Sequence, residues 1–241
     1  MRLPSVLMAF VFCAVLAFPP STFGQELPRI GAGAKVSTLG IGFEAATAVT
    51  PRSNVRGGFN FLNYNATSSS HGIAYDGSLR LRSIQVVYDQ YLFRGFHVSP
   101  GMLLYNGNKA DAIASVRAGE SFSLADVRYF SHQVAPVTGT ASFKLRKVAP
   151  MVLFGVGNLL PRNSRHLGFN FDFGVVFQGS PDVQLNLAGT ACAVSPTTAC
   201  VNAATDPIVQ SNLRREQERI SDDLQPFKYY PVVSAGMSWK F

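Results

Sequence analysis

A serine, a histidine and an aspartate stand close together in one long polar segment of the chain. Ser131 and His132 are adjacent, and Asp126 precedes them. These residue types supply the nucleophile, the base and the orienting carboxylate of hydrolases and acyltransferases. A triad is defined by its geometry in the folded protein, however, and a solvated loop contains the same kinds of residue. We therefore expect no catalytic site and no enzyme activity.

The histidines do not form a metal-binding motif. They are far apart in the chain, and none stands in an HExxH-type or other ligand-spaced cluster. They are His71, His97, His132 and His166. The sequence therefore predicts no metal and no other cofactor.

Two cysteines stand close together near the end of the chain. Cys192 and Cys200 have seven residues between them in a segment of small and polar residues. In an exported protein this spacing favours a local disulfide, and the alternative is a pair of reduced thiols without a chemical role. The export signal described next makes the disulfide the prediction.

The first 24 residues have the layout of a secretory signal peptide. Arg2 is followed by an apolar stretch at residues 3–18, then by Pro19-Pro20 and small residues up to Gly24. A membrane-spanning helix needs about 20 apolar residues, and the proline pair comes too early for one. We predict a signal peptide at residues 1–24 that is cleaved after Gly24, and one domain at residues 25–241.

Composition and charge narrow the class of protein. The chain has 241 residues, of which 47% are apolar and only 15% charged, and it is rich in Phe, Tyr, Gly and Pro. This composition favours β-structure with many turns. Lys and Arg outnumber Asp and Glu by 21 to 14, but the basic residues are scattered, with no run longer than Arg214-Arg215. Such scatter is a poor match for nucleic acid, which we exclude as a partner.

The mature chain alternates between large apolar residues and small or polar ones, the pattern of a strand with two different faces. The alternation is clearest where Phe169 and Phe171 alternate with Asn170 and Asp172, and it resumes beyond Gly179. Eight strands are predicted, at residues 29–37, 40–50, 54–65, 78–92, 96–104, 138–157, 167–187 and 227–241.

The register of three segments needs comment. In residues 78–92 the apolar side chains move from odd positions, such as Leu81, to even ones, such as Ile84, and a bulge near Ser83 would restore one face. In residues 138–157 the apolar side chains also change parity, and a bulge near Arg146-Lys147 would restore one face. Residues 29–50 are read as two strands, although Gly40 is also compatible with one continuous strand.

The connections alternate between short and long. Residues 51–53, 93–95 and 160–165 are compact, whereas 66–77, 107–137 and 188–224 are longer and more polar. Short turns at one rim and long loops at the other are typical of outer-membrane barrels. The last long loop contains the one helical stretch, which begins at Asp206-Pro207.

A soluble barrel would place the Phe-rich face in its core and the polar face in water. Two observations favour the membrane. The polar face is largely Gly, Ala, Ser and Asn, which suits a narrow lumen, and the charged fraction is low for a soluble protein. The predicted fold class is therefore all-β, an eight-stranded antiparallel transmembrane β-barrel with one loop helix.

The end of the chain resembles the C-terminal assembly signal of Gram-negative outer-membrane proteins. Trp239 and the terminal Phe241 close a run of alternating apolar residues. This resemblance implies delivery by the barrel-assembly machinery to the outer membrane, among its lipids and lipopolysaccharide. The segments around Gly107, Lys147, Gly179 and Tyr230 also resemble those of small barrels of the carbapenem-associated outer-membrane channel family, over residues 55–240.

Placing the last strand's end in the periplasm sets the direction of every other strand. Several cations are then predicted to point inward near the outer rim, with Asp182 as the opposing charge: Lys35, Arg80, Arg82, Lys144, Arg146 and Lys228. Deeper in the lumen, or near the inner rim, lie Glu44, Asp89, Asp172, Arg56 and Lys240. These charges form either a vestibule that attracts anions or an ion-pair network that plugs the lumen.

The leading functional hypothesis is a narrow, non-enzymatic channel for small solutes. Eight strands leave an interior barely wide enough for side chains, so a plugged structural or surface-interaction barrel is the first alternative. A lipid-modifying enzyme with its site at the outer rim is the second. The sequence does not identify a solute or an oligomeric state.

Overall fold

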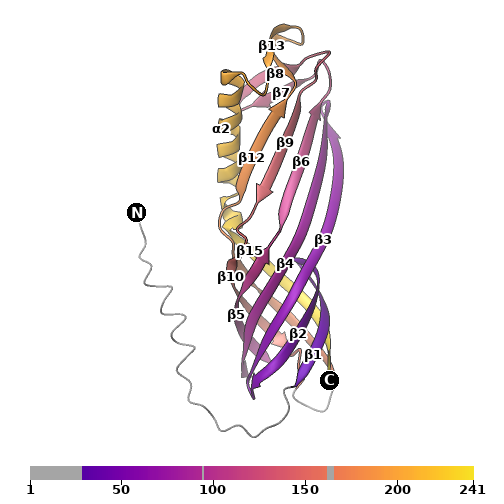
Figure 1. The fold of residues 1–241 in the computed structure, drawn as a ribbon, viewed down its shortest axis with the longest axis vertical. Coiled ribbons are helices and arrows are strands. Elements are labelled where there is room, and N and C mark those ends of the chain that lie inside the picture. The colour runs from indigo at the N-terminus through magenta and orange to yellow at the C-terminus, as the bar shows by residue number, and fades with distance from the viewer. Residues whose placement is uncertain (1–28, 94, 162–165) are drawn as a thin grey trace, which may run out of the picture.

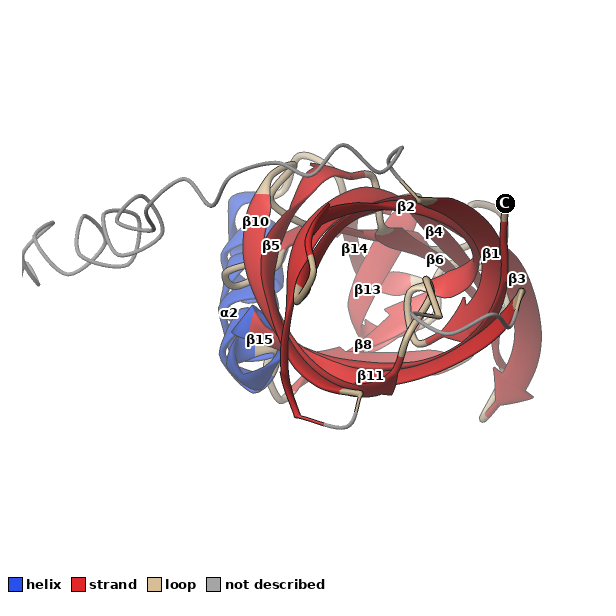
Figure 2. Cartoon of the chain, turned by 90° about the horizontal axis from the view of Figure 1, so that it is seen from below, coloured by secondary structure: helices blue, strands red, loops and turns tan. Residues whose placement is uncertain are grey.

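Eight antiparallel strands form a closed ring in the computed structural model, which describes residues 29–93, 95–161 and 166–241. The predicted signal peptide, residues 1–24, lies outside the described residues. Figure 2 shows the ring from below. In chain order its strands are β1 (Ile30–Ser37), β2 (Gly40–Thr50), β3 (Ser53–Ser70), β4 (Ile73–Phe93), β5 (Phe96–Asn106), β10 (Ala149–Gly157), β11 (Leu167–Phe177) and β15 (Tyr229–Lys240).

The ring closes because each strand pairs with two neighbours. Strands β1 to β5 are joined as consecutive neighbours, β10 pairs with β5 and β11, and β15 pairs with β11 and β1. A closed ring leaves no unpaired edge at the level of the barrel, which is the condition for a β-structure to cross a bilayer. The predicted eight-stranded antiparallel barrel is confirmed.

The barrel is apolar outside and polar inside. On β11, Phe169 and Phe171 are exposed while Asn170 and Asp172 are buried, and β15 alternates in the same way. A soluble barrel has the opposite arrangement, with its large apolar side chains in the core. The outward band of Phe, Ile, Val and Leu therefore identifies the surface that faces lipid.

Residues 29–50 form two strands. Strands β1 and β2 pair from Ile30 with Thr47 to Ser37 with Gly40, joined by a turn at Thr38-Leu39. Gly40 has φ of +110°, a conformation that residues with a Cβ rarely adopt. This glycine therefore belongs to a hairpin and not to the middle of a strand.

Two predicted strands are each divided in two. Residues 138–157 form β9 (Thr138–Lys144) and β10, and residues 167–187 form β11 and β12 (Asp182–Ala188). Strand β9 pairs with β6 and β12, whereas β10 pairs with β5 and β11. The predicted bulge near Arg146-Lys147 is thus a break between two parts of the fold.

The predicted irregularity near Ser83 exists, but it lies on the neighbouring strand. Ile84 pairs with Tyr105 and Gln85 with Leu103, so the extra residue is Leu104 of β5. Strand β4 itself keeps one parity, with alternate residues from Leu81 to Tyr91 buried inside the barrel. Its even-numbered residues consequently face outward throughout the ring.

Above the ring the sheet continues on one side as an extension (Figure 1). Strand β6 (Lys109–Val116) pairs with the upper half of β4 where β5 ends, and β9 and β12 follow it. A second sheet consists of β7 (Ser121–Leu124), β8 (Val127–Ser131), β13 (Thr190–Ser195) and β14 (Thr198–Asn202). Helix α2 (Pro207–Asp223) lies beside β12 and leads through the 3₁₀ turn η1 (Gln225–Lys228) into β15.

Helix α2 begins where the sequence predicts. Asp206 is the N-cap, and its side chain accepts hydrogen bonds from the backbone N–H groups of Ile208 and Val209, with Pro207 in the first turn. Val209 and Leu213 join an apolar core with Phe122 of β7. The extension therefore has a hydrophobic core of its own, separate from the barrel.

Candidate functional site

The centre of the barrel holds one guanidinium surrounded by carboxylates. Arg56 of β3 points inward; its Nη1 lies 2.7 Å from Asp172 Oδ2 and 3.5 Å from Glu44 Oε2, and its Nη2 lies 2.9 Å from Asp89 Oδ1. The three carboxylates come from β11, β2 and β4. One arginine therefore ties four of the eight ring strands together across the lumen.

Three further side chains complete this group, which we call the ionic cluster. Lys35 Nζ lies 3.2 Å from Glu44 Oε2, and Ser99 Oγ donates a hydrogen bond of 2.6 Å to Asp89 Oδ1. His97 Nε2 lies 2.8 Å from Asp172 Oδ1; because an ionised carboxylate only accepts, this nitrogen carries the proton. The ionic cluster thus consists of Lys35, Glu44, Arg56, Asp89, His97, Ser99 and Asp172.

The ionic cluster is closed to solvent. The side chain of Arg56 is 1% exposed, and those of its carboxylate partners are 0–1% exposed. Buried charges are tolerated when they are paired and hydrogen-bonded, and removing one partner of such a pair costs about 3–5 kcal/mol. The cluster therefore closes the lumen and strongly couples the strands around it.

Apolar layers lie on both sides of the ionic cluster. Toward the extension, Leu39 of the first hairpin packs with inward-facing residues of five ring strands, among them Val87, Leu103 and Leu153. At the other end, Leu159 and Leu160 pack against Ala46. The described lumen is thus filled at three successive levels.

The structure brings together five of the predicted lumen residues, Lys35, Glu44, Arg56, Asp89 and Asp172, and leaves the others outside the ionic cluster. Glu44, Asp89 and Asp172 lie in the ionic cluster as inward-facing groups, with Arg56 between them. Lys35, expected near the outer rim, is buried against Glu44 instead. Of the two interpretations of these charges, the geometry matches the ion-pair network.

Four predicted lumen residues lie on the outward side of the sheet. Arg80 and Arg82 share the outward face of β4, opposite to the face that carries the buried Leu81. Lys144 and Asp182 are paired in register on β9 and β12, and both are exposed. For Arg80 and Arg82, the expectation that they point into a vestibule rested on a change of face within β4, which does not occur. For Lys144 and Asp182, it rested on reading β9 and β12 as parts of two ring strands, which they are not.

Arg146 and Lys228 belong neither to the ionic cluster nor to the four outward-facing residues. Arg146 is exposed between β9 and β10, and a Cβ built on Gly179 would come within 2.8 Å of its Nε. Lys228 ends the 3₁₀ turn η1, with its Nζ 5.2 Å from the ring centroid of Tyr229. The predicted five-cation cluster is therefore not assembled.

Lys240, expected near the inner rim, donates a hydrogen bond to the Pro161 carbonyl.

His97 and Ser99 are site residues that the sequence analysis did not single out. Both stand on the small or polar face of the segment at residues 96–104, so their inward direction could have been read from the alternation. Their partners could not, because Asp172 is 75 residues from His97 and meets it only through the pairing of β5, β10 and β11.

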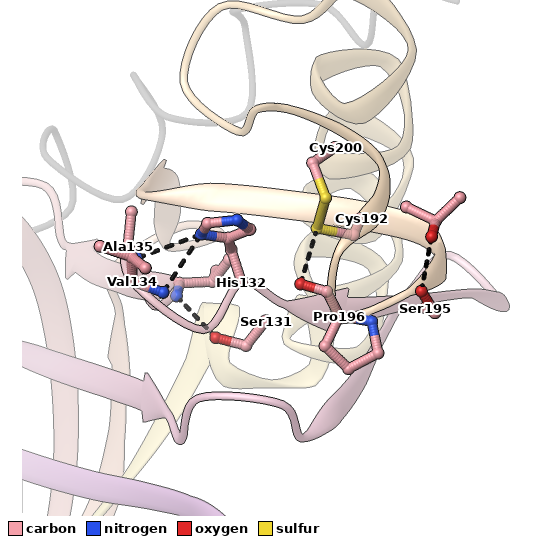
Figure 3. The surroundings of a disulfide bond; sticks show 10 residues. Ser131, His132, Val134, Ala135, Cys192, Ser195, Pro196 and Cys200 are labelled. Atoms are coloured by element: carbon pink, nitrogen blue, oxygen red, sulfur yellow. Dashed lines mark hydrogen bonds between the residues drawn. A yellow bond between two sulfur atoms is a disulfide. The ribbon is translucent and has the colours of Figure 1, made fainter.

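The serine, histidine and aspartate of the long loop have other partners. Ser131 Oγ is buried and accepts from the Val137 N–H, and His132 Nδ1 accepts from two backbone N–H groups (Figure 3). Asp126 pairs with Arg219 at 3.5 Å. These contacts stabilise turns of the extension, and they do not bring the three groups into the arrangement of a triad.

Cys192 and Cys200 form a disulfide with an S–S distance of 2.12 Å (Figure 3). They are directly opposite each other in the pairing of β13 with β14. Because β13 also pairs with β8, the bond fixes a hairpin at the far end of the extension.

Metal ligands and membrane helices were also sought in the described residues. No group of three or more His, Cys, Asp or Glu side chains is placed there to hold a metal ion. None of the helices in this part of the chain is long and apolar enough to cross a membrane.

Comparison with known proteins identifies the fold. The sequence matches no protein-family profile and no curated protein sequence. Among solved structures, Acinetobacter baumannii CarO and CarO2 each superpose with a TM-score of 0.58 and 20% sequence identity, over 90% of this chain and all of theirs. The chain therefore shares the outer-membrane barrel fold of these two proteins.

Proposed function

We propose that this protein is an outer-membrane barrel with a closed lumen, which anchors and displays its extension at the cell surface. The observation that carries the proposal is the burial of Arg56, which is 1% exposed and bound by three carboxylates at the centre of the barrel. A water-filled pore would have to pass this side chain and leave it accessible.

The closed lumen counts against the channel hypothesis. A solute that crossed the barrel would have to separate Arg56 from Asp172 or Asp89, and it would also have to displace the apolar layer around Leu39. Breaking one buried ion pair costs about 3–5 kcal/mol, before the apolar layer is considered. A structural or surface-interaction barrel requires neither step.

The extension is the part suited to contact with the surroundings. It has its own hydrophobic core, a disulfide and an N-capped helix, so it is a folded unit and not a set of simple loops. The outer membrane of a Gram-negative bacterium is the proposed location, with the extension outside and the chain end in the periplasm. The exposed Trp239 and Phe241 at that end support delivery by the barrel-assembly machinery.

Single-channel recording tests the closed lumen. Refolded protein that shifts mobility only on boiling, as a folded barrel does, is added to planar bilayers at high salt. We expect no unit conductance above that of bilayers without protein. Reproducible conductance steps, with an ion selectivity that changes when Glu44→Gln is introduced, would reject the proposal in favour of the channel.

A further inference from the structure

Three cations stand in one row across three neighbouring strands. Arg80 of β4 is directly opposite Lys109 of β6, which is directly opposite Lys144 of β9. All three lie on the outward face, the one opposite to the apolar core of the extension. Like charges placed directly opposite each other destabilise a sheet. An unfavourable row of this kind calls for anions that compensate it.

The chain supplies only part of that compensation. Asp111 Oδ2 lies 3.0 Å from Arg80 Nη2 and 3.1 Å from Lys109 Nζ, so one carboxylate is shared by two cations. The hydrogen bond from Lys109 lowers the pKa of Asp111, which keeps the carboxylate charged. Lys144 Nζ donates to the neutral Gln184, whose amide in turn binds Asp182.

Arg82 adds a fourth cation next to the row. It is exposed on the same face of β4, two residues closer to the ring than Arg80. Four cations therefore face two carboxylates, Asp111 and Asp182. The side chains of Arg80 and Lys109 are 47% and 38% exposed, so a ligand can reach them. We call Arg80, Arg82, Lys109 and Lys144 the outer basic row.

The outer basic row lies where the lipid-facing band ends. Below it on β4 the outward residues run from Leu92 to the exposed Ile84, which is directly opposite Phe59 of β3, while Phe61 of β3 is directly opposite Arg82. The ten residues from Leu92 to Arg82 span about 25 Å of height for a strand tilted by about 40°, which matches the apolar band of a membrane barrel. With the extension outside the cell, as proposed above, this height is the level of the outer-leaflet headgroups.

We propose that the outer basic row binds a phosphate group of the phosphorylated glycolipid of the outer leaflet. Arginine matches phosphate with two parallel N–H donors, and lysine adds a point charge. The acyl chains of the same lipid molecule lie against Phe61, which is opposite Arg82, and against Phe59 and Ile84 below it on the same face. Positive charge above an apolar surface is complementary to a lipid with a phosphorylated headgroup. A free phosphate would contact the cations but not the apolar residues. The site is independent of whether the lumen conducts.

Binding of lipid A to the full chain in detergent micelles tests this site. The probes are bisphosphorylated lipid A, lipid A from which the phosphates have been removed, and inorganic phosphate as a competitor. The test variant is Arg80→Gln, Arg82→Gln, Lys109→Gln, Lys144→Gln. The control variant removes four exposed cations elsewhere, Arg52→Gln, Arg117→Gln, Arg128→Gln, Arg214→Gln, so the net charge of the two variants is the same.

We expect the test variant to bind bisphosphorylated lipid A at least tenfold more weakly than the native chain, and the control variant to stay within twofold. Removing the phosphates from the lipid should weaken binding to the native chain by a similar factor. The double variant Arg82→Gln, Lys144→Gln leaves the ion pairs of Asp111 with Arg80 and Lys109 intact. It should weaken binding about threefold. It keeps the test valid if the fourfold variant fails to fold.

Two results would overturn the proposal. Equal loss of binding in the test and control variants would mean that net charge alone attracts the lipid. Full competition by millimolar inorganic phosphate would mean that the row is a site for free anions and that the apolar band contributes nothing.

Discussion

Arg56 and Asp172 meet inside the barrel, with Nη1 of the arginine 2.7 Å from Oδ2 of the aspartate, although 116 positions separate them in the chain. The contact joins β3 to β11, which are not neighbours in the ring. Hydrogen bonds between strands hold each strand only to its two neighbours. A contact across the lumen therefore fixes the cross-section of the barrel. The hydrogen bonds between neighbouring strands alone would allow the barrel to flatten.

Replacing Asp172 by asparagine should destabilise the barrel. The substitution leaves Arg56 with one charged partner fewer and removes the carboxylate that accepts from His97. Loss of one partner of a buried pair predicts a decrease in unfolding free energy of about 3–5 kcal/mol. The measurement is the urea concentration at which half of the protein has changed, on unboiled gels, from the faster-migrating folded barrel to the slower-migrating unfolded chain. Asp182→Asn, an exposed carboxylate on β12, is the control and should leave the midpoint unchanged.

How far the sequence predicts this interior can be judged from β4. The period-two pattern predicts an inward Asp89, and the structure places Asp89 inside the barrel, but the same pattern predicts that Leu81 faces lipid. Leu81 is buried inside the barrel, and the extra residue at the bulge is Leu104 of β5. Apolar side chains occur on both faces near the rim, so local alternation cannot tell a core leucine from a lipid-facing one.

The break at Arg146-Lys147 has a similar cause. A change of parity indicates either a bulge or the end of a strand, and the two differ only in which strands pair on each side. Strand β9 pairs with β6, which lies in a segment predicted as a loop, so the information needed is non-local. The ionic cluster is non-local in the same sense, since the alternation gives the direction of each member but not its partner.

Carboxylates at the end of the chain should block assembly. Trp239 is an outward residue of β15 and stacks on His166, and Phe241 follows the last strand residue. Asp at both positions removes the apolar signal and places charge at the lipid surface. Immunoblots of outer-membrane fractions should show loss of the variant, while Trp239→Phe with native Phe241 should reach normal levels. Normal levels of the Asp variant would contradict the assignment of Trp239 and Phe241 to the lipid-facing side of the barrel.

The disulfide should stabilise the extension and not the barrel. Closing the short loop between Cys192 and Cys200 contributes about 2–3 kcal/mol on the chain-entropy account. In Cys192→Ser with Cys200→Ser, protease should cleave near β13 and β14 sooner, while the gel shift on boiling stays as in the native protein. Thiol labelling of unreduced membranes should modify neither cysteine in the native chain.

The N-cap of α2 offers a test of the extension that is independent of the disulfide. Asp206→Ala removes the acceptor for two backbone N–H groups and should destabilise the helix by about 1 kcal/mol. Amide hydrogen exchange of residues 208–213 should then be about fivefold faster. Asp223→Ala, at the last residue of the same helix, is the matched control; equal effects of the two substitutions would show that charge and not capping is responsible.

Gly155 provides the sharpest test of the ionic cluster, because it leaves room for His97 and Asp172 to meet. A Cβ built on Gly155 would lie 2.3 Å from Asp172 Oδ1 and 2.5 Å from His97 Nε2. Gly155→Ala must therefore push the two groups apart, and overpacking of this kind costs about 1–3 kcal/mol in addition to the weakened contact. Gly57→Ala is the control, since its nearest neighbour is a backbone oxygen at 3.9 Å and a strand alanine is more stable than glycine by about 0.5–1 kcal/mol. On unboiled gels the urea midpoint should fall for Gly155→Ala and stay level or rise for Gly57→Ala. A Gly155→Ala protein as stable as the native chain would show that the contact between His97 of β5 and Asp172 of β11 is dispensable for stability.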